Sequence, residues 1–235
     1  MTTITTINFN HMQNNFISTD GNLALASNLK EPKMKTLFVH IEGQADFYMP
    51  WGVLYTPGAE KLIPVTDRFI EQAVKGGAIN HTLSTGDYHV EQEYLDCTYS
   101  DEGKSFPLHC VPGTPGFKHV IKFPAKNMTR LHKKDTSMWH QSATINNMPA
   151  QKIIAAKWSP MNWDIVMGGL CSDICVAYAA KGFMDRGYNV TILTDLVQGY
   201  QQEMPEYAAE NFAEYLARKQ LRLMTSAQFI KQKTA

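Results

Sequence analysis

The sequence predicts an α/β fold: a doubly wound parallel sheet with helices on both faces, built as a single domain. Runs of β-forming residues alternate along the chain with segments whose apolar residues recur at helical spacing, which is typical of parallel sheets. The stretch from Asp164 to Asp195 has this pattern most clearly, as a strand, a helix and a strand joined by a crossover expected to be right-handed. The 235 residues are 44% hydrophobic, which suffices for one core of ordinary size.

The first 33 residues differ in character from the rest of the chain. They are rich in Thr, Asn and Ser, lack sustained periodicity and close near Pro32. We interpret residues 1–33 as an extension, such as an arm that packs on a partner subunit, and residues 34–235 as the domain. A homo-oligomer is therefore expected.

Composition excludes several classes of partner. The formal net charge is +0 and neither a basic stripe nor an acidic block is present, which argues against nucleic acid as a partner. The sequence has no apolar run of bilayer length and no secretory signal, so we expect a cytoplasmic protein without a membrane partner. The four cysteines lack a secreted disulfide pattern, and a disulfide framework is not expected.

Within the domain, the elements follow from periodicity and from turn residues. Strands are expected at 36–41, near 78–85, at 164–167, at 188–193 and near 222–224. Helices are expected at 58–73, from Cys175 to the Gly187 stop, at 152–158 and at 204–218. Polar residues directly after these strands are candidate site residues, because sites form at the carboxyl ends of strands in open α/β sheets.

Cys175 is the candidate nucleophile. It lies in the first turn of the helix that follows the Gly168–Gly169 turn. Unpaired N–H groups and the helix dipole make that position positive, which favours a thiolate and stabilises an oxyanion formed beside it. A lone cysteine near a helix start is nevertheless more often a buried structural residue.

The run Ser172-Asp173-Ile174-Cys175-Val176 resembles the hallmark of the isochorismatase-like cysteine hydrolases, a superfamily that includes nicotinamidases. The resemblance covers about Lys35 to Phe229. The family's first motif, Asp-x-Gln-x-Asp-Phe, is matched by Gln44, Asp46 and Phe47, with Glu42 where the family has Asp. The resemblance implies that Glu42 accepts the thiol proton and returns it to ammonia; alternatively, Glu42 is a surface acid at a strand end.

A metal site is expected between Asp87 and His109. Asp87 and His89 are two apart and point the same way from an extended chain. The run Phe106-Pro107-Leu108-His109-Cys110 is similar to the nicotinamidase motif whose His binds metal, and Glu102 stands seven residues before that His. The resemblance implies the ligands Asp87, His89, Glu102 and His109, with Glu91 or Glu93 as alternatives to Glu102. Zinc is the expected metal, with manganese or iron possible.

A catalytic lysine is also implied by the family. Lys133 fits the family's spacing before Thr136 and Ser137, where Thr136 replaces the usual Tyr, and it is preferred over Lys122, Lys126 and Lys134. Its ammonium is expected to lower the pKa of Cys175 and to hold Glu42 as an anion. Phe47, Phe106 and Trp139 are expected to clamp a flat ring, although each is equally compatible with core packing.

The resemblance implies a metal-assisted amidase. The metal binds the ring nitrogen of nicotinamide, Cys175 forms a thioester, and backbone N–H groups around Cys171 and Cys175 stabilise the oxyanion. The products are nicotinate and ammonia. Two alternatives remain: an amidase for another small heteroaromatic or carbamoyl amide, and a non-catalytic scaffold, because Glu42 and Thr136 depart from the family pattern.

Overall fold

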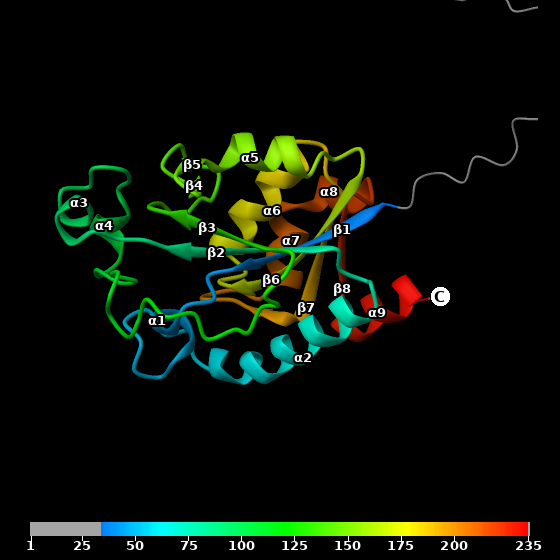
Figure 1. Cartoon of the computed structure of the whole chain (residues 1–235), viewed down its shortest axis with the longest axis horizontal. Helices are drawn as coiled ribbons and strands as arrows, with labels where there is room; N and C mark the ends of the chain where they lie inside the picture. Colours follow the sequence, from blue (N-terminus) through cyan, green and yellow to red (C-terminus); the bar gives the residue numbers. More distant parts are fainter. Residues whose placement is uncertain (1–33, 235) are drawn as a thin grey trace, which may run out of the picture. The chain divides into compact units, whose positions relative to one another are not determined.

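A central sheet of eight strands has the spatial order β5-β4-β3-β2-β1-β6-β7-β8 (Figure 1). The strands are β1 (Lys35–Ile41), β2 (His81–Asp87), β3 (Met128–Lys133), β4 (Thr144–Ile145), β5 (Met148–Pro149), β6 (Trp163–Leu170), β7 (Val190–Gln198) and β8 (Leu221–Met224). The computed structural model describes residues 34–234. The predicted extension at 1–33 lies outside the described residues.

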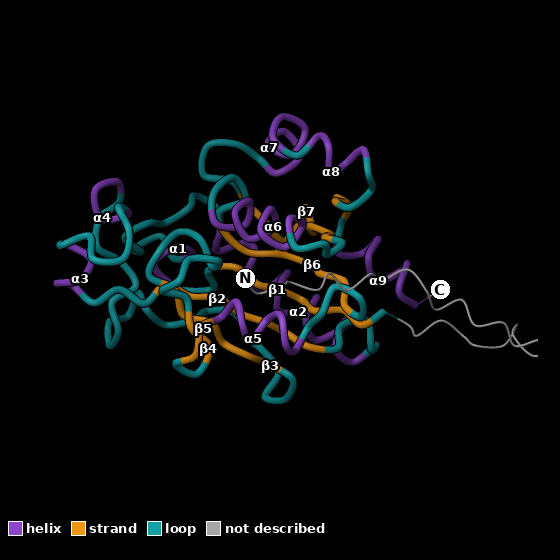
Figure 2. The backbone as a smooth tube through the Cα atoms, turned by 90° about the horizontal axis from the view of Figure 1, so that it is seen from above, coloured by secondary structure: helices purple, strands orange, loops and turns teal. Residues whose placement is uncertain are grey.

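Helices cover both faces of the sheet (Figures 1 and 2). The helices are α1 (Ala45–Tyr48), α2 (Leu62–Lys75), α3 (Glu91–Leu95), α4 (Glu102–Ser105), α5 (Ala150–Lys157), α6 (Cys175–Asp185), α7 (Met204–Asn211), α8 (Ala213–Ala217) and α9 (Ser226–Thr234). Helices α5, α6, α7 and α8 lie on one face, and α2 and α9 lie on the other. No helix of the described part is long and apolar enough to span a membrane.

The doubly wound α/β prediction is confirmed, with differences at the edges. The pairs among β1, β2, β3, β6, β7 and β8 are all parallel, whereas β4 and β5 form a short antiparallel edge that the sequence analysis did not predict. The expected helix at 204–218 is two helices that meet at Phe212. The terminal helix α9 was also missed; its Phe229 packs on Phe69 of α2.

The central strands are buried on both faces, as is usual for parallel strands covered by helices. In β1, Leu37 and Val39 belong to the core under α5, α6 and α7, while Phe38 belongs to the core under α2 and α9. Residue alternation along a strand explains this division.

The position of the site follows from strand order. From β1 the chain moves outward to β2 and β3, then returns to place β6 on the other side of β1, followed by β7 and β8. The order reverses between β1 and β6, and ligands of open α/β sheets bind at the carboxyl ends of strands at such a point. Glu42 directly follows β1, and Cys171 directly follows β6.

Candidate active site and metal centre

Three side chains from separate elements meet at the β1/β6 reversal. Glu42 follows β1, Lys133 is the last residue of β3, and Cys175 is the first residue of α6. The Lys133 ammonium nitrogen lies 3.1 Å from Glu42 Oε1 and 2.5 Å from Asp87 Oδ1. All of these side chains except Cys175 are at most 1% exposed, so the ammonium is buried between two carboxylates.

The other candidate lysines lie outside this cluster. Lys134 points to the opposite side, where its ammonium pairs with Glu93 at 2.5 Å. Lys122 is exposed beside Asp67, and Lys126 is also exposed. Because adjacent residues of a strand face opposite ways, Lys133 enters the site and Lys134 leaves it.

One ammonium cannot neutralise two buried carboxylates, and the pKa values divide accordingly. Burial raises the pKa of Asp87, but the charge of Lys133, with the neighbouring imidazoles of His109 and His89, outweighs this effect and holds it well below its usual range. Burial and the charge of Asp87 raise the pKa of Glu42 to about 7 despite Lys133. Glu42 is therefore the group of the pair that exchanges a proton near neutrality.

The state of Cys175 differs from expectation. The sequence analysis expected the helix start and Lys133 to lower the thiol pKa. In the structure burial raises the pKa of Cys175 well above its usual value, and Glu42 and Asp87 add to this effect, while Lys133 opposes it. The resting residue is thus a thiol, and it needs a base in order to become a nucleophile.

The backbone around Glu42 aims its side chain. Glu42 has φ of +50°, a left-handed conformation that costs a non-glycine residue roughly 1–3 kcal/mol. The Thr85 hydroxyl donates to Glu42 Oε1 at 3.1 Å, and the Glu42 backbone N–H donates to the Thr85 hydroxyl oxygen at 3.1 Å. Contacts with β2 therefore hold the longer glutamate side chain against Lys133.

Four buried side chains form a second group beside Asp87. Donor atoms of Asp87, His89, Glu102 and His109 all lie within 4.8 Å of one another and could hold a metal ion. These are the four ligands expected from the sequence. Two imidazoles and two carboxylates suit zinc, and manganese or iron equally, since each accepts mixed nitrogen and oxygen ligands.

The chemistry of these donors fits a cation. His109 Nδ1 lies 2.8 Å from the Pro107 carbonyl oxygen, so Nδ1–H donates there and Nε2 faces Asp87 Oδ2 at 3.2 Å. Two further atoms, His89 Nε2 and Glu102 Oε2, are buried without a hydrogen-bond partner. A metal ion would satisfy all of these acceptors at once, and the Pro107 carbonyl would fix the tautomer of His109.

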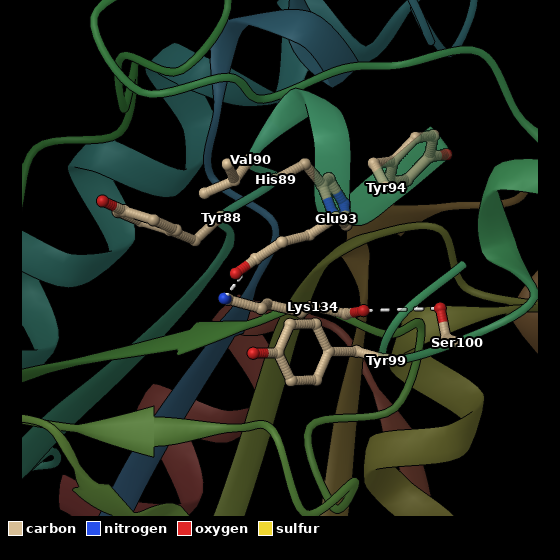
Figure 3. Close-up of a pocket in the computed structure, with 8 residues that line it drawn as sticks. All are labelled: Tyr88, His89, Val90, Glu93, Tyr94, Tyr99, Ser100 and Lys134. Atoms are coloured by element: carbon tan, nitrogen blue, oxygen red, sulfur yellow. Dashed lines mark hydrogen bonds and ion pairs between the residues drawn. The ribbon is translucent and has the colours of Figure 1, made fainter. Parts of the chain in front are cut away.

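The alternative acids lie outside this group. Glu91 is exposed, and Glu93 pairs with Lys134 on the far side of the loop (Figure 3). The same view shows the Ser100 hydroxyl bonded to the Lys134 carbonyl oxygen at 3.3 Å. We call Glu93, Ser100 and Lys134 the loop clip, because they fasten the loop that carries Glu102 to the end of β3.

Residues of the first motif brace the site. The Gln44 amide forms two hydrogen bonds with the Asp87 backbone. Its oxygen accepts from the Asp87 N–H at 2.6 Å, and its NH₂ donates to the Asp87 carbonyl at 2.9 Å. Asp46 accepts the backbone N–H of Cys110 at 2.7 Å, which anchors the segment after His109. A side chain at Gly116 would collide with the Asp46 carboxylate, with the nearest oxygen at 2.1 Å.

An apolar cavity joins the nucleophile to the metal ligands. Its empty volume is about 430 Å³, including space that is open to solvent. Its lining comprises Phe47, Leu54, Asp87, Glu102, Phe106, Thr136, Cys171, Ile174, Cys175 and Tyr200. The structure therefore places Phe47, Phe106 and Cys171 at the cavity, as expected.

Trp139 is a correction, because it does not line this cavity. Its ring N–H donates to the Ala179 carbonyl of α6 at 3.1 Å, and its ring packs on Phe183 at 4.8 Å between centroids. Arg186 covers the ring, with its guanidinium carbon 4.0 Å from the ring centroid. Trp139 is a packing residue under α6.

Tyr200 and its loop were not foreseen. The Asp173 carboxylate accepts three successive backbone N–H groups, from Tyr200, Gln201 and Gln202, at 2.7 to 3.0 Å. Asp173 thereby holds the loop after β7 against the cavity. The signal in the sequence was Asp173 itself, an acid two residues before the nucleophile.

Comparison with known proteins agrees with this architecture. The sequence matches the isochorismatase domain family over residues 36–227. The nicotinamidase/pyrazinamidase of Mycobacterium tuberculosis is 23% identical over 185 residues, which cover 75% of this chain and 93% of that protein.

Two solved structures share the fold. A pyrazinamidase of Pyrococcus horikoshii in complex with zinc has a TM-score of 0.62 at 22% identity, covering 81% of this chain and 99% of that chain. An N-carbamoylsarcosine amidase from Thermoplasma acidophilum has a TM-score of 0.58 at 20% identity, covering 82% and 97%. With the family match spanning most of its length, the chain belongs to the isochorismatase family.

Proposed function

We propose that this protein is a metal-assisted cysteine amidohydrolase that converts nicotinamide and water into nicotinate and ammonia. One observation carries the proposal: the Cys175 thiol and two members of the acidic and imidazole group, Asp87 and Glu102, line the same small apolar cavity. A nucleophile and a cation site on opposite parts of one cavity can hold a small amide at two points.

Glu42 is the proton carrier in this proposal. With a pKa of about 7, its carboxylate is available to take the Cys175 proton, and the resulting acid is strong enough to give that proton back. The sulfur bonds to the carbonyl carbon as the proton leaves, and the electron pair of the carbonyl moves to oxygen. The backbone N–H of Cys175, at the start of α6, would stabilise that oxygen together with the backbone around Cys171.

Collapse of this adduct breaks the carbon–nitrogen bond. Glu42 returns the proton to the departing nitrogen, which leaves as ammonia, and a thioester remains on Cys175. Water then attacks the thioester carbon, gives a proton to Glu42 and releases the acid, with the sulfur regaining a proton. Throughout, Lys133 supplies a fixed positive charge beside Glu42.

Asp87, His89, Glu102 and His109 would hold the metal. A bound divalent ion would supply a Lewis acid that accepts a ring-nitrogen lone pair and orients the carboxamide. Phe47 and Phe106 provide apolar walls for the flat ring.

A second substrate class is a small non-aromatic carbamoyl amide, as the name of the Thermoplasma relative suggests. Thr136 at the cavity wall favours this alternative to some degree, since a hydroxyl there can bond to a polar substrate. The assembled Glu42–Lys133 pair argues against a non-catalytic scaffold, because burying an ammonium between two carboxylates has a desolvation cost that an apolar side chain would avoid.

The test is ammonia release from nicotinamide by purified protein loaded in turn with zinc, manganese or iron. Turnover that Cys175→Ala abolishes supports the proposal. If the folded, metal-loaded protein does not hydrolyse nicotinamide but hydrolyses a carbamoyl amide, the carbamoyl amide is the substrate class. If neither amide is hydrolysed, and Glu42→Asp does not restore activity, the protein is a non-catalytic scaffold.

A further inference from the structure

Buried polar atoms without a partner gather in one place away from the cavity. Among the described residues, His40 Nδ1, Ser84 Oγ, both ring nitrogens of His119, Arg130 Nη1 and His132 Nδ1 are buried with no hydrogen-bond partner. Native proteins leave few such atoms, and each requires an explanation. The unpartnered atoms of His89, Glu102 and Glu42 belong to the site already described, but these do not.

Strand register places these residues together. His40 of β1 pairs with Ser84 of β2, which pairs with Arg130 of β3, and His132 of β3 lies one pair further along, opposite Gly86. All four point to the face that carries α2, because Phe38, two residues from His40, packs on Phe69 of α2. The site residues Lys133 and Asp87 lie one residue out of step with this set and therefore point to the opposite face of the sheet.

His119 completes the group from the covering loop. A methyl group on Gly43 would lie 3.1 Å from His119 Nδ1 and 3.3 Å from His40 Nδ1, so these two nitrogens converge. A methyl group on Gly86 would lie 2.9 Å from His119 Nε2. We call His40, Ser84, His119, Arg130 and His132 the basic cluster.

The basic cluster carries a positive charge that the described residues do not balance. No carboxylate of the described part lies within 4 Å of the Arg130 guanidinium, whose face contact is the Phe123 ring at 5.9 Å. Burial, together with the charge of Arg130, lowers the pKa of His40 and of His119 to about 3, so both rings are neutral donors near pH 7. The Arg130 side chain is partly exposed, but its Nη1 atom is buried without a partner beside the fully buried His40 and Ser84. An anion is the counterpart that would accept from a charged donor and from its neutral neighbours together.

Size and walls limit the ligand. Phe123 packs edge-on to His40 at 5.5 Å, and Phe117 stacks on His132 at 6.3 Å. Together with the glycine backbone at 43 and 86, these rings pack directly against the donors, which favours a ligand of few atoms. We propose that the basic cluster binds one small monovalent anion, of the class of chloride or nitrate, on the α2 face of the sheet.

The anion would also support the candidate site from behind. His119 lies against Gly86 and beside the Gln44 amide oxygen, which grips the backbone of Asp87. An anion that fixes His119 therefore stiffens the support of a metal ligand without touching the cavity.

The experiment titrates the full-length protein with sodium chloride or sodium nitrate at constant ionic strength, with gluconate, which is too large for this space, as the balancing anion. Melting temperature and chloride NMR line width are recorded. Wild-type protein should show a saturable rise of roughly 5 °C at a hundredfold excess over the dissociation constant, with matching line broadening. Arg130→Met should lose both responses, and His119→Phe gives the same comparison if Arg130→Met does not fold.

Arg68→Met is the matched control, because Arg68 is an exposed arginine on α2 whose described hydrogen bond goes to the nearby Pro64 carbonyl; it should keep both responses. A wild-type protein without a saturable response to either anion would mean that only water occupies the cluster. A response of equal size in Arg130→Met and His119→Phe would place the anion elsewhere, for example at a bound metal. Either result overturns the proposal.

Discussion

The two halves of the candidate site are built in different ways. Glu42, Lys133 and Cys175 are fixed at the ends of β1 and β3 and at the start of α6, whereas His89, Glu102 and His109 lie in the long segment between β2 and β3. Asp87, the last residue of β2, belongs to both halves, since it contacts Lys133 and His109. Proton transfer needs hydrogen-bond distances that strand ends can fix, while a metal can gather its ligands from a loop.

The largest effect is expected for Cys175→Ala, which should abolish activity without changing metal binding. Removal of the nucleophile should lower ammonia release by at least roughly 10⁴-fold, because the proposed thioester forms on the Cys175 sulfur. Metal affinity, measured by competition with a chromophoric chelator, should stay unchanged. A large loss of metal affinity in this variant would mean that the two halves are not independent.

Asp87→Asn should damage both halves at once. Loss of one ligand charge should weaken metal binding by at least about 100-fold. Because the charge of Asp87 raises the pKa of Glu42, the variant should also move that pKa downward. The first effect is measured by chelator competition, and the second by carboxyl-labelled NMR titration of the metal-free protein. If Glu42 titrates as in the wild type, the charge of Asp87 does not raise its pKa.

The pH dependence of activity tests only the half of the site formed by Glu42, Lys133 and Cys175. Glu42 must be ionised to accept the thiol proton, so kcat/KM should fall about tenfold per pH unit below pH 7. The same raised pKa means that the folded state binds this proton more tightly than the unfolded chain between pH 4.5 and about 7, so its contribution to the unfolding free energy decreases as pH rises through that window. Glu42→Gln should lower activity by roughly 10²- to 10⁴-fold and remove this limb of the profile; an unchanged limb would assign it to another group.

The smallest expected effect concerns the loop half. Lys134→Met breaks the loop clip at Glu93, so metal affinity should fall about tenfold while activity at saturating metal stays near that of the wild type. Lys104→Met is the control, since the Lys104–Asp101 pair lies in the same loop but is exposed, and it should have no measurable effect. Equal losses in both variants would attribute the effect to net charge and not to the clip.

The sequence predicted best the residues whose chemical type and spacing along the chain both match a known motif. Lys133 was chosen because its spacing before Thr136 and Ser137 fits the family motif, and in the structure strand alternation separates it from Lys134. The four candidate metal ligands were expected from an Asp-x-His pair, from the motif run that contains His109 and from the position of Glu102 seven residues before it, and the structure brings their donor atoms together. Confirmation of the fold rests on the same alternation of β-forming and helical periods.

Tertiary contacts decided what the sequence could not. Trp139 is aromatic and close to Lys133 in sequence, yet Ala179, Phe183 and Arg186 of the α6 region draw it away from the cavity. Tyr200 reaches the cavity only because Asp173, 27 residues earlier, holds its backbone. Burial also reversed the expected pKa of Cys175, since desolvation depends on the surrounding fold and not on sequence position.

The pairing of β1 with β6 also determines how late in synthesis and folding the site is completed. Strand β1 pairs with β6, so Leu37 is aligned with Ile165, a residue far along the chain. During synthesis Glu42 emerges early, and its partners on β2 and β3 follow, but the nucleophile arrives only with β6 and α6. Such non-local parallel pairing forms slowly. A chain truncated before β6 would contain Glu42, Lys133 and the candidate metal ligands but not Cys175, so the candidate nucleophile joins the other site residues only after β6 and α6 have been made.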